Sequence, residues 1–191
     1  MTTGATCSID EVLRGLESCT GSVRMTSSKA LATLSETEPE RVYPRFAEIA
    51  ALLRSPNQIV QWNAARALAS LARVDSQGRL EHILPLYLHP LTGSKLITAC
   101  NVVGAAPAIA RAKPHLADRI ASRILRVESA TFPTPECMHV ARGHAVRALD
   151  EMYPYLKRRK PVLAFVRRQL DNPRNSTRKA AAAFLKRHAV K

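Results

Sequence analysis

The chain has 191 residues, of which 46% are hydrophobic and 23% charged, and it carries a net charge of +14. These proportions suit one globular domain with a substantial core and exclude an intrinsically disordered chain. Only 5% of the residues are aromatic, and Ala and Leu dominate the apolar residues, which favours closely packed helices over a sheet.

Five pairs of helices are predicted in chain order, within a single domain that spans residues 1–191. The first pair opens with apolar residues at helical spacing behind a candidate cap at Ser8, with Glu11 three residues further on. In the second pair a helix over 43–54 ends at the Ser-Pro-Asn turn of 55–57. The approximate ranges of the five pairs are 7–36, 42–73, 79–111, 114–153 and 155–190.

Two of the later pairs depart from this regular pattern. Pro85, Pro90 and Pro107 fall in the third pair, so its helices are expected to be kinked or shortened. Residues 128–136 of the fourth pair are an insertion, which is either a binding feature or a tolerated surface loop. The fifth pair repeats the second without a gap, because residues 160–171 follow the pattern of 43–54 at a constant offset.

The second helix of each pair carries an internal repeat. Residues 60–68 serve as the template, with Val60, Ala64 and Leu68 on one helix face. Similar segments recur after intervals of about 36 to 43 residues, and small Ala residues let neighbouring helices approach closely. These segments are 23–31, 100–106, 141–149 and 177–185.

The helix–turn–helix unit resembles the HEAT family of armadillo-type repeats. The Ser-Pro-Asn turn before Val60 is similar to the turn of that family, and so are the openings at Val23 and Thr177. The resemblance implies an all-α fold, a right-handed α-α superhelix of about five helix pairs. It also implies a ladder between repeats, formed by a turn acid and an Arg early in the second helix. Candidate members are Arg24, Arg142, Arg178 and Asp171.

Nothing in the sequence predicts membrane insertion or secretion. No stretch approaches the roughly 20 apolar residues that cross a bilayer, and Met1 to Asp10 lacks the features of a secretory signal. The cysteines Cys7, Cys19, Cys100 and Cys137 form no Cys-x-x-Cys pair. We therefore expect a cytoplasmic protein whose cysteines are reduced and mostly buried.

The sequence contains no catalytic motif, so we expect no enzyme, no metal ligand and no cofactor. There is no Gly-x-Ser-x-Gly, no Gly-rich phosphate loop and no His-Glu-x-x-His. One enzymatic alternative stays open, because some HEAT-like proteins are alkylpurine DNA glycosylases that use aromatic residues and an Asp. The residues available for that role are Trp62 with Asp150 or Glu151.

The positive charge is concentrated near the C-terminus. Residues 153–191 hold twelve Lys and Arg against one acid, and a basic end of this kind attracts acidic or phosphate-rich partners. Within it lies a basic turn that consists of Lys157, Arg158, Arg159 and Lys160. Further candidates lie on the second helices, where stacked repeats would align them along a concave surface. These are Lys29, Trp62, Arg66, Arg147, Arg178, Lys179 and Arg187.

Two functions fit this pattern. The leading hypothesis is a non-enzymatic scaffold that binds a partner protein through its concave surface, with Trp62 as an exposed anchor. The alternative is binding to the phosphate backbone of a nucleic acid by the basic inner surface and the basic C-terminal end.

Overall fold

The computed structural model describes residues 8–188, and within this range every regular element is a helix and none is a strand. The all-α class predicted from the sequence is therefore confirmed. The chain divides into two compact units, Met1–Leu80 and Glu81–Lys191, called the N-terminal unit and the C-terminal unit below. The single superhelical domain over 1–191 stays a prediction.

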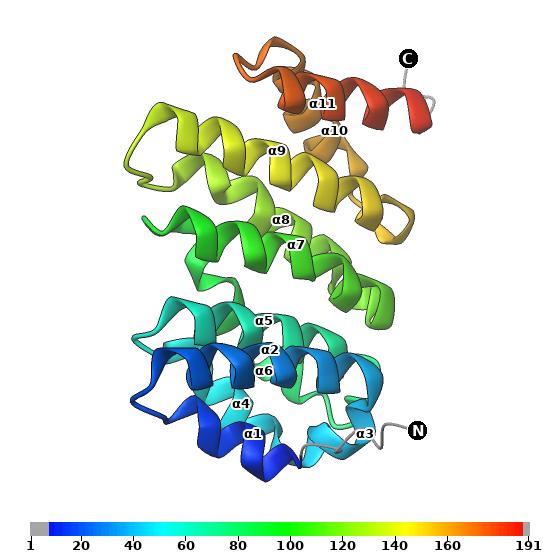
Figure 1. The fold of residues 1–191 in the computed structure, drawn as a ribbon. Helices are drawn as coiled ribbons and strands as arrows, with labels where there is room; N and C mark the ends of the chain where they lie inside the picture. Colours follow the sequence, from blue (N-terminus) through cyan, green and yellow to red (C-terminus); the bar gives the residue numbers. More distant parts are fainter. Residues whose placement is uncertain (1–7, 189–191) are drawn as a thin grey trace, which may run out of the picture. The chain divides into compact units, whose positions relative to one another are not determined.

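The N-terminal unit is built from two layers of helix. The helix α2 packs between α1 and α5, and α4 packs on α5 (Figure 1). Leu31 of α2, Ile49 of α4 and Leu68 of α5 are fully buried, so the apolar stripe predicted on residues 60–68 faces the core. The elements are α1 (Ile9–Leu16), α2 (Gly21–Thr37), α3 (Pro39–Val42), η1 (Tyr43–Arg45), α4 (Phe46–Ala51), η2 (Leu52–Arg54) and α5 (Gln58–Leu71).

Local sequence signals set several helix starts in this unit. Ser8 and Glu11 form a capping box at α1, because each side chain accepts a hydrogen bond from the backbone N–H of the other. The side chain of Asn57 accepts from the first N–H groups of α5. Buried Asp75 accepts from the N–H groups of Arg79 and Leu80 at 2.9 and 3.1 Å, where α6 begins.

The helix predicted over 43–54 differs in the structure. Helix begins earlier, at Pro39, and Pro44 lies in a 3-10 turn between α3 and α4. A proline has no N–H and cannot donate an α-helical hydrogen bond, and the backbone leaves α-helical geometry at Arg45, directly after Pro44, with φ −91° and ψ 15°. The interruption therefore has a local cause that the repeat pattern did not reveal.

From residue 79 onward, three long helices lie side by side in chain order. The helix α9 packs between α7 and α11, while α8 packs on α7 and α9, and α10 packs on α11 and α8 (Figure 1). The elements are α6 (Arg79–Leu88), η3 (His89–Thr92), α7 (Leu96–Ala112), η4 (Pro114–Leu116), α8 (Ala117–Leu125), η5 (Arg126–Ser129), α9 (Pro135–Met152), η6 (Tyr153–Tyr155), α10 (Arg159–Arg168), η7 (Gln169–Asp171) and α11 (Asn175–Arg187).

The helices of the third pair were expected to be kinked or shortened, and α7 is not shortened. This helix runs for 17 residues and includes Pro107. The proline removes one backbone hydrogen bond, but its neighbours Val103, Ala106 and Ile109 are buried. Burial of that face offsets the missing bond, as tertiary packing often overrides a local preference.

Polar contacts join residues that are one repeat apart in the sequence. The Arg45 side chain reaches Asp10, 35 residues earlier, and Arg168 reaches Glu128 at 2.8 Å, 40 residues earlier. Further contacts of this kind among the described residues have separations between 32 and 40 residues, close to the repeat interval. They include Tyr43–Asp75, Arg73–Glu36, His115–Glu81, Lys157–Asp118, Arg158–Asp118, Arg174–Glu136, Thr177–His139, Arg187–Asp150 and His188–Asp150.

Two of the three arginines proposed for a ladder between repeats, Arg24 and Arg178, bond to the turn before their own helix instead. The Arg24 guanidinium donates to the carbonyl of Ser18 at 2.8 Å, six residues earlier. Arg178 donates in the same way to the carbonyl of Asn172, also at 2.8 Å and six residues earlier. Asp171 is exposed. These two arginines thus close the turn before their own helix, and the ladder implied by the resemblance is not what they form.

Two glycines allow close helix contacts, one in each unit. A Cβ at Gly15 of α1 would lie 2.0 Å from the Ser27 hydroxyl of α2. A Cβ at Gly143 of α9 would lie 2.6 Å from the hydroxyl of Thr177 on α11. Distances this short require a glycine. Gly143, which lies in the repeat, therefore permits the close approach of the second helices α9 and α11, and Gly15 permits that of α1 and α2.

Candidate functional site

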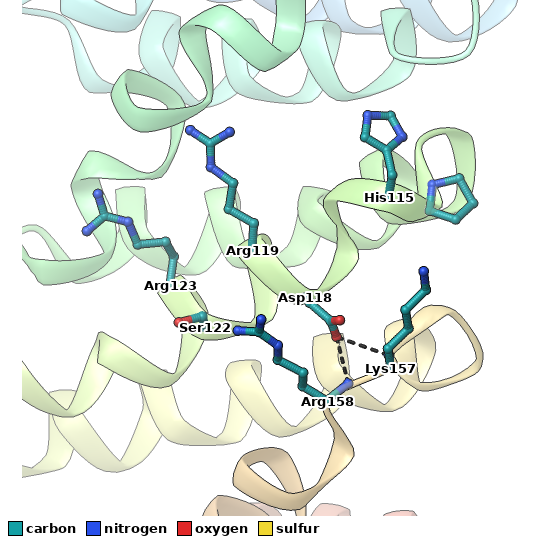
Figure 2. Close-up of a pocket in the computed structure, with 8 residues that line it drawn as sticks. His115, Asp118, Arg119, Ser122, Arg123, Lys157 and Arg158 are labelled. Atoms are coloured by element: carbon teal, nitrogen blue, oxygen red, sulfur yellow. Dashed lines mark hydrogen bonds between the residues drawn. The ribbon is translucent and has the colours of Figure 1, made fainter.

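A cavity of about 510 Å³ lies between α8 and the segment that leads into α10 (Figure 2). Its volume falls in the range of small-ligand sites. We call this cavity the basic pocket, because four of its eight lining residues are Arg or Lys. The lining residues are Pro114, His115, Asp118, Arg119, Ser122, Arg123, Lys157 and Arg158.

One wall of the basic pocket is the polar face of α8. Arg119 and Arg123 are four residues apart, so they project from the same side of this helix (Figure 2). Ile120 and Ile124, on the other face, are fully buried. The amphipathic pattern of α8 therefore anchors the helix through its isoleucines and leaves both guanidinium groups at the surface.

The opposite wall is the segment before α10, and Asp118 holds it in place. One carboxylate oxygen of Asp118 accepts the backbone N–H groups of Lys157 and Arg158 at 3.1 and 3.0 Å (Figure 2). These bonds satisfy donors next to the start of α10, whose N-terminus has no side-chain cap. Asp118 thereby fixes two cationic residues beside the two arginines of α8.

The cations of the basic pocket exceed the acids that face them. Glu81 lies 3.3 Å from a ring nitrogen of His115 and 3.8 Å from Arg119. Among residues 8–188, Arg123, Lys157 and Arg158 have no carboxylate within ion-pair distance of their side chains. The site therefore has an uncompensated positive charge that attracts anions.

The net charge of the C-terminal unit adds to the positive electrostatic potential of the basic pocket. Residues 81–191 contain twenty Lys and Arg against seven Asp and Glu, a net charge of +13, whereas residues 1–80 contain nine against eight, a net charge of +1. Nearly all of the net charge of the chain thus belongs to the C-terminal unit. An anion at the basic pocket interacts favourably with every cation within about 8–10 Å, the screening length at ordinary salt concentration.

The basic turn predicted from the sequence divides between two roles. Lys157 and Arg158 line the basic pocket. The Arg159 guanidinium lies 4.7 Å from the centre of the Tyr153 ring and donates to the carbonyl of Leu156 at 3.0 Å. Lys160 is exposed. The turn therefore supplies two residues to the pocket, while Arg159 stabilises the fold.

The candidates on the second helices have different surroundings. In the N-terminal unit Lys29 and Arg66 are exposed and Trp62 is half-buried. They lie on α2 and α5, which pack against each other. Their participation in a binding surface stays a prediction.

In the C-terminal unit Arg147 of α9 and Lys179 of α11 are exposed. Arg178 is half-buried and bonded to the carbonyls of its own turn, and Arg187 pairs with Asp150. Two of these four candidates therefore have a structural partner, which lowers the number of cations that a ligand can use along these helices.

The sequence predicted only two of the eight lining residues, Lys157 and Arg158. The candidates on helices were all on the second helix of a pair, whereas α8 is a first helix. The six residues not predicted are Pro114, His115, Asp118, Arg119, Ser122 and Arg123. Two features of the sequence could have indicated these residues. Arg119 and Arg123 have helical spacing, and Asp118 precedes Lys157 and Arg158 by 39 and 40 residues, about one repeat.

No other cluster in the described part of the chain offers metal or thiol chemistry. Among residues 8–188 no group of three or more His, Cys, Asp or Glu side chains is arranged to hold a metal ion. Cys19 is exposed, and Cys100 and Cys137 are half-buried, so the expectation of mostly buried cysteines is wrong for Cys19; Cys7 lies outside the described residues. Burial raises the pKa of the Cys100 thiol to about 11, which disfavours the reactive thiolate.

Comparison with known proteins gives no family for this chain. No protein-family model matches it, and no curated protein is significantly similar to it in sequence. Within residues 8–188 no helix has both the length and the apolar character needed to cross a membrane.

Proposed function

We propose that this chain is a HEAT-like α-solenoid scaffold without catalytic activity, and that it binds an acidic segment of a partner protein. The basic pocket of the C-terminal unit is the docking site in this proposal. The observation that carries it is the set of three pocket cations, Arg123, Lys157 and Arg158, that have no carboxylate partner among the described residues.

The repeat architecture supports the scaffold part of the proposal. Helices α7, α9 and α11 pack side by side in chain order, and polar contacts link residues 32 to 40 positions apart. Repeats of this kind contact mainly their neighbours and form a rigid framework that presents surface residues to a partner.

The geometry of the pocket favours a short acidic segment over a long polyanion. Three unpaired cations line one cavity, and two candidates for a longer track, Arg178 and Arg187, are bonded within the fold. Nucleic-acid binding draws its affinity from many phosphates neutralised at once. A cavity walled by a few cations instead suits a few carboxylates or similar groups at close range.

Nucleic-acid binding remains the second candidate, and the net charge of +13 on residues 81–191 is the observation that favours it. Arg147 and Lys179 are also exposed and available to phosphates. In this case binding would depend on total charge and steeply on salt, and no single pocket would dominate.

A binding experiment with matched charge changes separates the two candidates. The full chain is titrated with a labelled acidic peptide and with a labelled DNA duplex, each at two salt concentrations. The pocket variant is Arg123→Glu with Arg158→Glu, and the control is Lys95→Glu with Arg111→Glu, two exposed residues of the C-terminal unit outside the pocket. Both variants change the net charge equally.

We expect the pocket variant to weaken peptide binding by at least about tenfold, equivalent to about 1.4 kcal/mol, and the control to change it far less. Equal losses in both variants would contradict the docking site. Tighter binding of DNA than of peptide, lost equally in both variants, would favour the nucleic-acid candidate instead.

A further inference from the structure

The donors of the basic pocket greatly outnumber its acceptors. Each guanidinium of Arg123 and Arg158 has five N–H donors, Lys157 adds three, and the exposed hydroxyl of Ser122 adds one more. The carboxylate of Asp118 is the pocket's one acid, and one of its oxygens is already engaged by two backbone N–H groups. A ligand that fits must therefore accept many hydrogen bonds and donate few.

The charge of the site points in the same direction. Arg123, Lys157 and Arg158 contribute three positive charges without an ion-pair partner among the described residues, and Asp118 contributes one negative charge. The start of α10 at Arg159, where the side chain of the N-cap residue Arg158 makes no capping hydrogen bond, adds partial positive charge next to Lys157 and Arg158. A group with two negative charges matches this excess better than a single carboxylate.

The arrangement of the hydrogen-bond donors also favours a phosphate over a carboxylate. Two guanidinium groups line the cavity, one carried by α8 and one by the segment before α10 (Figure 2). A planar carboxylate has two oxygens and can engage one guanidinium in a bidentate pair, whereas a tetrahedral phosphate has three terminal oxygens and can engage two.

We propose that the basic pocket binds a phosphate monoester carried by a Ser or Thr side chain of the partner segment. The inference rests on the proposed function and narrows it to a partner recognised in its phosphorylated form. Phosphorylation adds roughly 1.5 to 2 negative charges and three strong acceptors, which are the properties that the pocket lacks and can complement. Arg123 and Arg158 bind the phosphate oxygens, Lys157 supplies further charge, and Ser122 donates one hydrogen bond.

The test compares three versions of one synthetic peptide on the full chain: with phosphoserine, with Glu and with Ser at the central position. A short DNA strand of equal charge and inorganic phosphate are additional probes. The variants are Arg123→Gln with Arg158→Gln, the control Lys95→Gln with Arg111→Gln, and Asp118→Asn. The last variant keeps an acceptor for the two backbone N–H groups and removes the negative charge from the pocket.

We expect the phosphoserine peptide to bind about tenfold more tightly than the Glu peptide, and inorganic phosphate to compete with it at high concentration. The Arg123→Gln, Arg158→Gln variant should lose this preference, and the control should retain it. Asp118→Asn should increase the affinity for the phosphoserine peptide, a gain that a misfolded variant cannot produce.

The possible failures are distinguishable. Equal affinity for the phosphoserine and Glu peptides would overturn the phosphate inference and leave the acidic-segment function standing. Failure of both peptides to bind would overturn the proposed function itself. Equal or tighter binding of the DNA strand, lost in the same pocket variant, would assign the pocket to backbone phosphates and overturn the inference.

Discussion

The two units of this protein use their carboxylates in opposite ways. In the N-terminal unit acids and cations are almost balanced, and one cation, Arg45, is shared by two acids, Asp10 and Glu48. In the C-terminal unit acids are scarce, and one acid is shared by two basic side chains. Glu128 meets Arg142 and Arg168, and Asp150 meets Arg187 and His188.

This difference distinguishes the charged residues that stabilise the fold from the cations that remain unpaired at the surface. In the C-terminal unit Asp118, Glu128 and Asp150 all join segments about one repeat apart, so the available acids serve the fold. Cations that the fold does not need, such as Arg123 and Arg158, stay unpaired at the surface. Surface charge of one sign destabilises a compact state through repulsion, and these unpaired cations are the groups to which the proposed acidic segment would bind.

The largest expected effects are losses of stability when a buried phenylalanine is removed. They should be similar in the two units, because a hydrophobic core stabilises both. Phe46 of the N-terminal unit and Phe184 of the C-terminal unit are 2% and 0% exposed, and each contacts a tyrosine ring. Phe46→Ala and Phe184→Ala should each lower the free energy of unfolding by about 3–5 kcal/mol. Urea unfolding measures the loss, and a cost below about 1 kcal/mol in one variant would show that its unit is held by other means.

The next largest effects concern the close helix contacts in each unit. Gly15→Val and Gly143→Val should each cost about 2 kcal/mol, because a Cβ collides with Ser27 or Thr177. The matched control is Gly104→Val in α7, where a Cβ meets nothing within 4 Å. That control should be neutral or slightly stabilising, since valine has the better helix propensity. Thermal unfolding of the three variants checks the contrast.

A smaller effect is expected where a carboxylate serves both the fold and the pocket. Asp118→Ala should lower stability by about 1 kcal/mol, because the N–H groups of Lys157 and Arg158 lose their acceptor. The same change removes the negative charge from the basic pocket. Asp171→Ala removes an exposed acid of the same unit and should leave stability nearly unchanged. A larger loss in Asp171→Ala than in Asp118→Ala would contradict this assignment, which urea unfolding can decide.

The smallest expected effects are changes of stability with pH, which fall in a different pH range in each unit. Burial, and then the charges of Arg147 and Arg174, lower the pKa of His144 below its ordinary value of 6.5. The folded state therefore resists protonation, so stability is complete above about pH 6.5 and declines as the pH falls below it. His144→Gln should remove this component from unfolding curves measured between pH 7.5 and 5.5.

The stability of the N-terminal unit should depend on pH in a more acidic range. The hydrogen bonds from Arg45 hold the pKa of Glu48 below its ordinary value of 4.5. Its contribution is therefore present above about pH 4.5 and disappears as the pH falls through the lowered pKa. Glu48→Gln should reduce the acid sensitivity there and leave the region near pH 6 unchanged. A change near pH 6 in this variant would contradict the assignment.

The local sequence predicted much of the secondary structure. The Ser8 and Glu11 capping box and the buried stripe through Val60, Ala64 and Leu68 all occur as expected. These features depend on residues a few positions apart, so they can be predicted from the local sequence. The 3-10 turn at Pro44 and the uninterrupted α7 through Pro107 were not predicted, because each depends on the balance between a missing hydrogen bond and the burial of neighbouring side chains.

The sequence predicted only two of the eight residues that line the candidate site. Lys157 and Arg158 stood out because they are adjacent, but the sequence could not tell that Arg159 turns onto Tyr153 while its neighbours line a cavity. Nor could it tell that Arg178 and Arg187 are bonded within the fold.

The sequence by itself therefore determined most of the helices, their apolar faces and the gradient of charge, since these follow from composition and short-range spacing. The tertiary structure decided which cations of the C-terminal unit have an acidic partner. It brought Asp118 against Lys157 and Arg158 and placed Arg119 and Arg123 beside them. The reason is physical: electrostatic pairing depends on distances of a few ångströms between residues about forty positions apart, and only the packing of one helix pair on the next sets those distances.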